Sequence, residues 1–361
     1  MTGAGKSLLA VVRADAGLEL GSGHIRRSLA LIAPLMEQGW CAGLAVNRAA
    51  VDSVPEIAAE KRFDLHVLEP ADTDRAEREA AALSRRWPQG ARLLVVDHYE
   101  LGSAFERKAR SFARCILAVD DLADRRHDVD ALLDSAPGRN ASDYGPLMDR
   151  AGRLLLGPAF APVAPAFRAA REGALARRKT CNGRVSRILV SFGGTDPLGM
   201  TLRALQALAD IEFDGAVEAV FGLPGKNAAA ARARASRLPF RLEVTVGASD
   251  MAARMAQADL AVGAAGSSAF ERCCVALPAV TIAVADNQAA IAKGLAKAGA
   301  TYALGSPDTA RVEELARAIA ALLANPQQVT DMSARAAELV DGRGAERVLE
   351  AVLGPALVGQ R

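Results

Sequence analysis

The sequence has no apolar run of the roughly 18 to 20 residues that a helix needs to span a bilayer, and its first residues carry no signal-peptide cleavage site. Its five cysteines are scattered, without the CxxC or Cys/His spacing of a zinc site or a disulfide framework. Aromatic residues make up only 4% and the formal net charge is +2, which disfavours nucleic-acid binding. We therefore expect a soluble cytoplasmic protein with no membrane or nucleic-acid partner and no metal.

Short apolar runs alternate with helical patterns in both halves of the chain. Most of these runs lack a period of two, which is typical of parallel strands that helices cover on both faces. In the first half the predicted strands are residues 7–15, 41–47, 64–69, 92–99, 115–122, 130–135 and 153–157. In the second half they are residues 187–194, 218–223, 241–247, 259–266 and 279–285, and residues 309–352 are expected to be helical.

A proline-rich stretch separates the two halves. Residues 158–184 contain Pro158, Pro162 and Pro165, followed by a charged, glycine-containing run, and this pattern predicts a linker. The predicted fold class is therefore α/β, with doubly wound, Rossmann-like domains at residues 1–157 and 185–361, the second ending in helices. Ligands of such sheets bind beyond the carboxyl ends of the strands, so we expect the site in a cleft between the domains.

Three motifs resemble known binding signatures but lack a required part. GAGKS at residues 3–7 lacks the earlier glycine and the preceding strand of a phosphate-binding loop. GSGHIR at 21–26 has Arg26 where the dinucleotide fingerprint has its third glycine. Asp128 and Asp130 precede a predicted strand, so a solvated turn explains them better than a metal site. Neither NAD nor another cofactor is expected.

His24 follows a Gly-Ser-Gly turn, where a predicted helix begins. The unpaired N–H groups and partial positive charge of a helix N-terminus disfavour an imidazolium. We therefore expect a neutral ring that can accept a proton from water, with Asp15, at the end of the first strand, as the candidate to orient it. A capping or packing histidine explains the same pattern equally well.

Further polar residues follow strands of the first half. Asp97, His98 and Tyr99 end one strand and are expected near His24, although Asp97 could simply cap the next helix. Asp120 and Asp121 end another strand, where ion pairs with nearby arginines are the simpler interpretation. The remaining candidates for substrate contact in this half are Arg13, Gly21, Gly23 and Arg27.

Three polar loops follow strands of the second half: SFGGTDP (191–197), GAAGSSAFE (263–271) and AVADNQ (283–288). In the first loop, Thr195 and Asp196 are N-cap candidates and Pro197 is the expected first helical residue. The second loop can donate to a diphosphate, although a capping box between Ser268 and Glu271 explains it without a ligand. Three such loops at one sheet edge favour a nucleotide-sugar site. Its candidate residues are Gly193, Gly194, Asp196, Gly266, Ser267, Ser268, Glu271, Asn287 and Gln288.

The motifs GSGHIRRSLAL, VVDHYELG, AVDDLADRRHDVD, SFGGTDP and AGSSAFERCCVALP followed by ADNQ resemble the PseG-type nucleotide-sugar hydrolases of pseudaminic acid biosynthesis, over about residues 9–300. The resemblance implies a GT-B architecture in which the second domain binds UDP without a metal. It also implies roles for single residues: His24 as general base, Tyr99 at the sugar, Glu271 on the ribose hydroxyls, Ser267 and Ser268 on phosphate, and Asn287 and Gln288 on sugar or phosphate. The linker departs from the family pattern, with Ala164 and Ala166 in place of an arginine and a glutamate.

The expected reaction is inverting hydrolysis of UDP-2,4-diacetamido-2,4,6-trideoxy-β-L-altropyranose, or a close relative, to the free sugar and UDP. His24 would deprotonate the attacking water. Two alternatives use the same residues. One is a GT-B glycosyltransferase that passes the sugar to an acceptor hydroxyl, and the other is a nucleotide-sugar binding protein without turnover.

Overall fold

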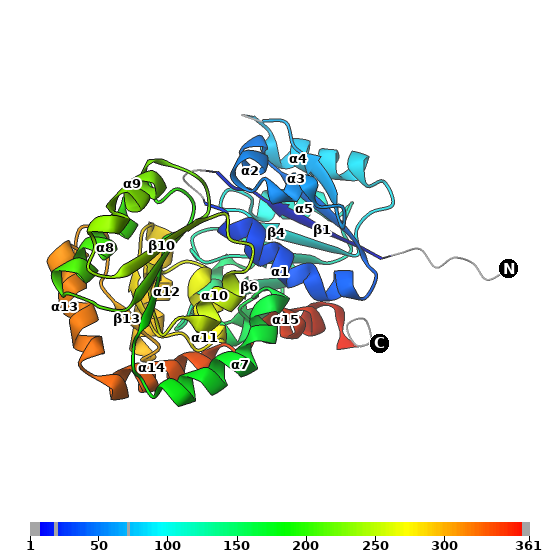
Figure 1. Cartoon of the computed structure of the whole chain (residues 1–361). Helices are drawn as coiled ribbons and strands as arrows, with labels where there is room; N and C mark the ends of the chain where they lie inside the picture. Colours follow the sequence, from blue (N-terminus) through cyan, green and yellow to red (C-terminus); the bar gives the residue numbers. More distant parts are fainter. Residues whose placement is uncertain (1–7, 18–20, 71–72, 356–361) are drawn as a thin grey trace. The chain divides into compact units, whose positions relative to one another are not determined.

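The computed structural model describes residues 8–17, 21–70 and 73–355, and the chain divides into two compact units. The first unit runs to Ala164 and resumes at Arg343, and the second is Pro165–Gly342 (Figure 1). The GAGKS motif lies outside the described residues. Among the described helices, none combines the length and the apolar character that a membrane span requires.

A seven-stranded parallel sheet in the order β3-β2-β1-β4-β5-β6-β7 forms the centre of the first unit. The order reverses between β1 and β4, and ligands of open α/β sheets bind beyond the carboxyl ends of strands at such a switch point. All seven predicted strands are present. They are β1 (Leu9–Ala14), β2 (Cys41–Val46), β3 (Asp64–Val67), β4 (Leu93–Asp97), β5 (Ile116–Val119), β6 (Ala131–Asp134) and β7 (Arg153–Leu156).

Helices cover both faces of this sheet. Ala10, Val12 and Ala14 of β1 pack in one core with α1 (Gly23–Glu37) and α15 (Gly344–Leu353). The intervening residues Leu9 and Val11 pack in a second core with α4 (Arg75–Arg86) and α5 (Ser103–Ala109). Two apolar faces explain why the strands show no period of two. The remaining helices are α2 (Arg48–Ser53), α3 (Glu56–Ala59), α6 (Ala141–Tyr144) and the 3-10 turns η1 (Gly145–Leu147) and η2 (Pro158–Phe160).

Helix α15 belongs to the first unit although it ends the chain. Its residues Ala345, Val348 and Leu349 are buried in the core that contains α1, and Figure 1 shows the two helices side by side. The predicted boundary, which gave all of residues 185–361 to the second domain, is therefore wrong for this helix. Helical spacing shows that α15 has an apolar face, but it does not specify which core that face joins.

The second unit contains a six-stranded parallel sheet in the order β10-β9-β8-β11-β12-β13, with its switch point between β8 and β11. One face packs against α8, α9 and α13. Five strands match the predicted runs, and the edge strand β13 was not predicted, because its three residues are too few to form an apolar run. The strands are β8 (Arg187–Ser191), β9 (Ala216–Phe221), β10 (Arg241–Val246), β11 (Leu260–Ala264), β12 (Ala279–Ile282) and β13 (Thr301–Ala303).

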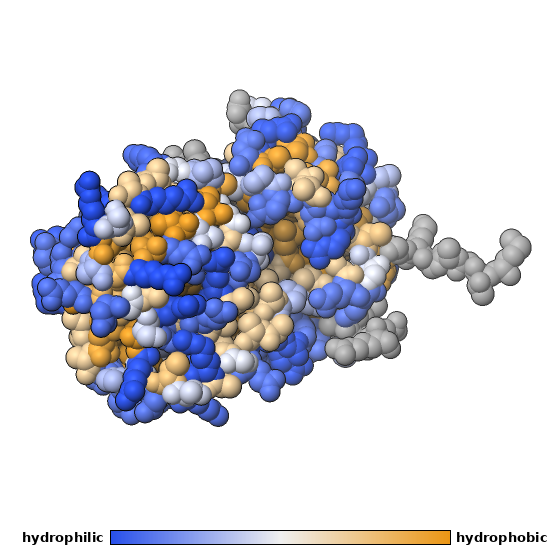
Figure 2. Space-filling view, in the orientation of Figure 1, coloured by the Kyte–Doolittle hydropathy of each residue, from blue (hydrophilic) through white to orange (hydrophobic). Residues whose placement is uncertain are grey.

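The helices of the second unit include those expected near its C-terminal end. They are α7 (Pro165–Cys181), α8 (Met200–Asp210), α9 (Lys226–Arg234), α10 (Met251–Gln257), α11 (Ser268–Cys274), α12 (Ala289–Lys297), α13 (Val312–Leu323), α14 (Pro326–Leu339) and the 3-10 turns η3 (Ala235–Arg237) and η4 (Asp286–Gln288). On the face drawn in Figure 2, hydrophilic residues are interspersed with hydrophobic ones.

Helix α7 occupies most of the predicted linker, residues 158–184. Pro165 begins the helix, where its missing N–H leaves no hydrogen bond unmade. Arg171 and Arg178 donate to backbone carbonyl oxygens at the C-terminal ends of α10, α11 and α14. Carbonyl oxygens at helix C-termini carry partial negative charge and favour cations. The segment that the sequence predicts to be a linker is therefore largely a packed helix of the second unit.

Candidate functional site

His24 lies in the first turn of α1, beyond the switch point between β1 and β4. Its Nδ1 is 2.5 Å from Oδ1 of Asp97, the last residue of β4, and the histidine is 5% exposed. A carboxylate at Nδ1 favours the tautomer with its hydrogen there, which leaves Nε2 as a proton acceptor. Within the described parts of the chain, no group hydrogen-bonds to Nε2.

Asp97 is held by three side chains. Besides His24, Arg27 donates through Nε at 2.7 Å and through Nη2 at 2.6 Å, and the Ser28 hydroxyl donates at 2.9 Å. Burial opposes ionisation, but the Arg27 charge and His24 outweigh it and hold the pKa of Asp97 well below its usual value. The carboxylate is therefore ionised and can stabilise an imidazolium that forms at His24.

Arg27 also reaches a second carboxylate. Its Nη1 donates to Asp121 at 2.8 Å, and the Tyr99 hydroxyl lies 3.4 Å from the same oxygen. The Tyr99 ring meets His24 edge to face, with ring centroids 4.7 Å apart. Tyr99 therefore contacts the His24 ring directly. Arg27 influences this ring mainly through the Asp97 carboxylate, which both residues contact. We name His24, Arg27, Ser28, Asp97, Tyr99 and Asp121 the His24 cluster.

Asp15 does not orient His24, contrary to the prediction. It accepts from Nε2 of His98 at 2.9 Å and from the backbone N–H of Asn47 at 2.8 Å. It also forms ion pairs with Arg13 and Arg75. These contacts outweigh the effect of burial and lower the pKa of Asp15. Asp15 is therefore part of a separate ionic cluster.

The reason lies in the alternation of side chains along parallel strands. Asp97 has the parity of Leu93 and Val95, which pack in the core that α1 covers. Asp15 has the parity of Leu9 and Val11, which pack on the other face of the sheet. Because His24 belongs to α1, which covers the same face as Asp97, its ring contacts Asp97 and not Asp15.

Arg13 is not placed to bind a substrate, which corrects a second prediction. It is 1% exposed, and its guanidinium is shared between Asp15 and Glu79, with Nε 2.6 Å from the Glu79 carboxylate. His98, which was expected near His24, joins this same cluster through Asp15. Asp97 does not cap the following helix either, because α5 has Gly102 as its N-cap.

The glycines before His24 shape the turn into α1. Gly21 has φ +70°, a conformation that residues with a Cβ rarely adopt, and Gly23 is the first residue of the helix. Nothing lies within 4 Å of a Cβ placed on Gly21, so backbone conformation rather than space requires glycine there. The predicted substrate contacts of both glycines remain proposals.

In the loop after β8, Gly193 and Gly194 have φ of +77° and +24°. The next helix, α8, begins at Met200 rather than at the expected Pro197. Asp196 is buried, and its carboxylate accepts from the N–H groups of Met200 at 3.0 Å and Thr201 at 2.7 Å. Asp196 therefore caps α8 and is not exposed to a ligand, which corrects its predicted role in substrate binding.

The loops after β11 and β12 meet within the second unit. A Cβ placed on Gly266 would lie 3.4 Å from Nε2 of Gln288, whose Oε1 accepts from the Val284 N–H at 3.1 Å. Asn287 lies in the same 3-10 turn as Gln288. The structure thus places Gly266 and Gln288 together, as the prediction of one shared site requires.

The capping box proposed for Ser268 and Glu271 does not form at the start of α11. Ser267 is the N-cap and its side chain makes no capping hydrogen bond, while Ser268 is already the first helical residue. The Ser268 hydroxyl instead accepts from Arg272 at 3.3 Å. Sequence analysis did not single out Arg272, although its spacing of four residues from Ser268 places both on one helix face.

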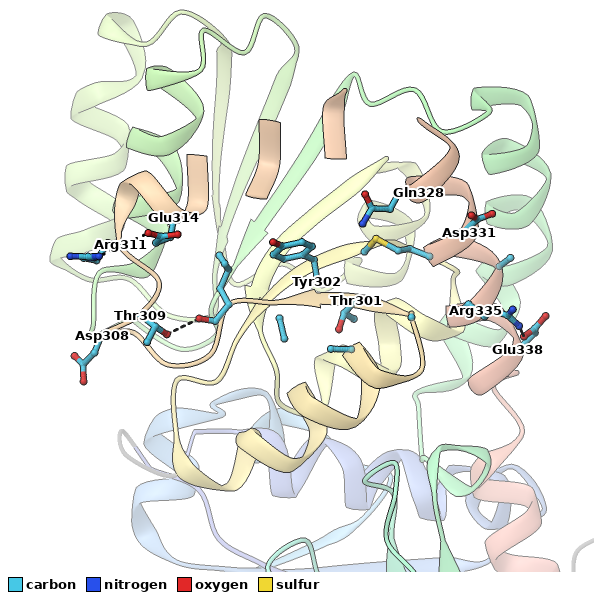
Figure 3. Close-up of a pocket in the computed structure, with 16 residues that line it drawn as sticks. Thr301, Tyr302, Asp308, Thr309, Arg311, Glu314, Gln328, Asp331, Arg335 and Glu338 are labelled. Atoms are coloured by element: carbon cyan, nitrogen blue, oxygen red, sulfur yellow. Dashed lines mark hydrogen bonds and ion pairs between the residues drawn. The ribbon is translucent and has the colours of Figure 1, made fainter. Parts of the chain in front are cut away.

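A cavity of about 1200 Å³ lies elsewhere in the second unit, along β13, α13 and α14, and Tyr302 points into it (Figure 3). None of the predicted site residues lines it. In the described ranges, no group of three His, Cys, Asp or Glu side chains is arranged to hold a metal ion.

Comparison with known proteins finds similarity over parts of this chain. Residues 218–348 match the model of the glycosyltransferase family 28 C-terminal domain. SpsG, the spore coat polysaccharide biosynthesis protein of Bacillus subtilis (strain 168), is 31% identical over 199 residues, which are 54% of this chain and 57% of SpsG. The chain thus matches little more than half the length of this curated relative.

Solved structures show the fold. MurG of Acinetobacter baumannii superposes with a TM-score of 0.70 at 16% identity, covering 96% of this chain and 99% of MurG. The UDP-GlcNAc 2-epimerase of Neisseria meningitidis, bound to UDP-GlcNAc, has a TM-score of 0.59 at 10% identity, covering 96% of this chain and 100% of the epimerase. The two parallel α/β sheets are those of the GT-B fold, and the predicted fold class is confirmed.

Proposed function

We propose that this chain is a GT-B enzyme that takes the sugar from a UDP-sugar and transfers it to an acceptor hydroxyl. The family 28 domain match, the likeness to MurG and the similarity to SpsG support glycosyl transfer better than hydrolysis. The observation that carries the proposal is the pair of His24 and Asp97 at the switch point of the first sheet.

In the proposed reaction, Nε2 of His24 takes the proton of the acceptor hydroxyl while that oxygen attacks the anomeric carbon. The bond from this carbon to the diphosphate oxygen breaks, and UDP leaves with the electron pair. Ionised Asp97 stabilises the imidazolium, as the carboxylate does in other His–Asp pairs. Attack opposite the leaving group inverts the anomeric carbon.

The proposal assigns the nucleotide to the second unit. Gly193, Gly194 and the loop of Gly266, Ser267 and Ser268 bind the diphosphate, and the remaining roles are those implied by the resemblance: Glu271 on ribose, Asn287 and Gln288 on sugar or phosphate. The close approach of Gly266 to Gln288 supports one shared site for the loops that follow β11 and β12. Donors fixed around the diphosphate stabilise its growing charge, so no strong general acid is needed.

Hydrolysis is the second candidate, and the motifs around His24, Tyr99 and Ser267 favour it through their resemblance to PseG-type enzymes. Water then replaces the acceptor, His24 keeps its role, and the substrate is UDP-2,4-diacetamido-2,4,6-trideoxy-β-L-altropyranose or a close relative. The two candidates differ in the acceptor and share the rest of the chemistry.

The test is UDP release from UDP-amino sugars with and without acceptor sugars, in heavy-oxygen water. Release that requires an acceptor, with an inverted product, is the expected result. Steady release without an acceptor, with one heavy oxygen in each free sugar, would support hydrolysis and contradict transfer. Label in UDP would contradict attack at the anomeric carbon by either route, and UDP-sugar binding without any product would indicate a binding protein.

A further inference from the structure

Arg272 of α11 is 2% exposed, and its guanidinium joins the two ends of the loop between β11 and α11. Its Nη2 donates to the carbonyl oxygen of Ala264 at 2.6 Å, and its Nη1 donates to Oγ of Ser268 at 3.3 Å. A Cβ placed on Gly263 would lie 2.4 Å from the carbonyl oxygen of Ser191 and 3.2 Å from Nη1, so the glycine is required mainly by the neighbouring strand and also lies close to the guanidinium. The loop Ala265–Ser267 therefore connects Ala264 and Ser268, and the Arg272 side chain hydrogen-bonds to both of them.

This guanidinium has no ion-pair partner among the described residues, and the carboxylate that acts on it electrostatically, Glu271, does so from a greater distance. No carboxylate of the described residues lies within ion-pair distance of Arg272, and its Nε has no hydrogen-bond partner. Burying a charge without a partner is unfavourable. Burial lowers the pKa of Arg272 to about 10, so the side chain is still protonated at neutral pH. A buried cation that the protein leaves unpaired can interact favourably with an anion bound nearby.

We propose that Arg272 is the cation that recognises the diphosphate of the UDP-sugar from behind the Gly266–Ser268 loop. Because Ser268 Oγ accepts from Arg272, its own hydrogen is available for a phosphate oxygen. Arg272 is thus a positioning residue that orients Ser268 and adds positive charge beneath the loop. The inference rests on the proposed function, because it assumes a UDP-sugar as ligand.

The test compares UDP with uridine, which lacks the phosphates, by titration calorimetry on the full chain. Arg272→Met keeps the length of the side chain and removes its charge. Loss of charge-assisted interactions predicts that the Kd for UDP rises about 10-fold or more, while the Kd for uridine changes less than about 2-fold. The melting temperature is expected to stay the same or rise, because replacing an unpaired buried charge by an apolar side chain is often neutral or stabilising.

Two further variants keep the inference testable if Arg272→Met does not fold. Arg272→Lys retains the charge and is expected to restore most of the preference for UDP over uridine. Ser268→Ala, in the loop, is expected to weaken UDP about 3- to 10-fold and leave uridine unchanged.

Equal losses for UDP and uridine in Arg272→Met would assign Arg272 a purely structural role and overturn the inference. An unchanged affinity for UDP in both Arg272→Met and Ser268→Ala would also overturn it, while the proposed function stands. A wild-type chain that binds neither UDP nor uridine would overturn the proposed function and this inference together.

Discussion

Arg13 and Arg27 of the first unit are held differently from Arg272 of the second. In the first unit, Arg13 is shared by Asp15 and Glu79, and Arg27 is shared by Asp97 and Asp121. In the second unit, Arg272 meets only a carbonyl and a hydroxyl. A neutralised network fixes its members before any substrate binds, whereas a cation without a partner gains most when an anion arrives. The difference suits the proposal that the first unit positions a base and the second unit binds phosphate.

The largest effect is expected at His24, the proposed proton acceptor in the first unit. His24→Ala removes that acceptor and should lower turnover by roughly 10²- to 10⁴-fold, or about 3–5 kcal/mol, because general base catalysis typically contributes that much. Affinity for UDP should not change, since the nucleotide is assigned to the second unit. Steady-state kinetics and calorimetry measure both quantities. His66→Gln, within β3, serves as the control. Turnover at the wild-type rate in His24→Ala would remove His24 from the mechanism.

Asp97→Asn and Asp15→Asn separate the two ionic clusters of the first unit. Asp97→Asn should lower turnover by roughly 10²-fold or more, because an amide at Nδ1 no longer fixes the tautomer or stabilises the imidazolium. Asp15→Asn changes a carboxylate that is also buried, on the other face of the sheet. It should lower stability and leave turnover per folded molecule within about 3-fold. Equal kinetic losses in both variants would contradict the distinction between the clusters.

A third prediction concerns a buried histidine of the first unit that lies between two carboxylates. His127 is fully buried, with Nδ1 2.7 Å from Glu106 and Nε2 3.4 Å from Asp120. Burial alone would lower its pKa, but the two carboxylates raise it from 6.5 to about 9. The resulting stabilisation, up to about 3 kcal/mol, is fully present below pH 6.5 in folded protein and is lost as the pH rises through about 9.

Urea unfolding at several pH values measures this loss. The free energy of unfolding of the wild type should fall between pH 6.5 and 9.5, and His127→Gln should fall less over the same interval. A parallel decline in the two proteins would show that other groups cause the pH dependence.

The smallest effect is expected for the Tyr99 hydroxyl, which is 3.4 Å from Asp121, a carboxylate that Arg27 also contacts. Tyr99→Phe keeps the ring against His24 and should change turnover by less than about 3-fold. Tyr99→Ala also removes the ring and should cost about 10-fold by loosening the imidazole. Kinetics of the two variants distinguish the contribution of the ring from that of the hydroxyl, and a larger loss in Tyr99→Phe would assign the hydroxyl a direct role.

The pattern of the sequence predicted most of the fold, because buried parallel strands form apolar runs bounded by polar turns. It missed β13, which has only three residues, and α7, whose prolines and charges are also typical of a loop. It placed α15 in the wrong unit, because amphipathic spacing defines an apolar face without defining the core that receives it.

Within the candidate site, the sequence placed Asp97 and Tyr99 near His24 but named Asp15 as the candidate to orient the ring. Counting side-chain parity along β1 and β4 would have favoured Asp97, since strand residues two apart share a face. Helical spacing from His24 also locates Arg27 and Ser28. The missing partner of Arg272 could not have been predicted, because an absent carboxylate is a property of packing rather than of local sequence.

The polypeptide passes from one unit to the other twice, after Ala164 and again after Gly342. In the first unit, the segments next to these two passages pack closely against each other. A Cβ placed on Gly344 would lie only 2.2 Å from the carbonyl oxygen of Ala161. A single proteolytic cut therefore cannot release either unit as a complete fragment. Residues 165–342 form one continuous segment for separate expression, whereas residues 1–164 alone would leave the apolar surface beside α1 uncovered and should require α15 supplied as a peptide or by fusion.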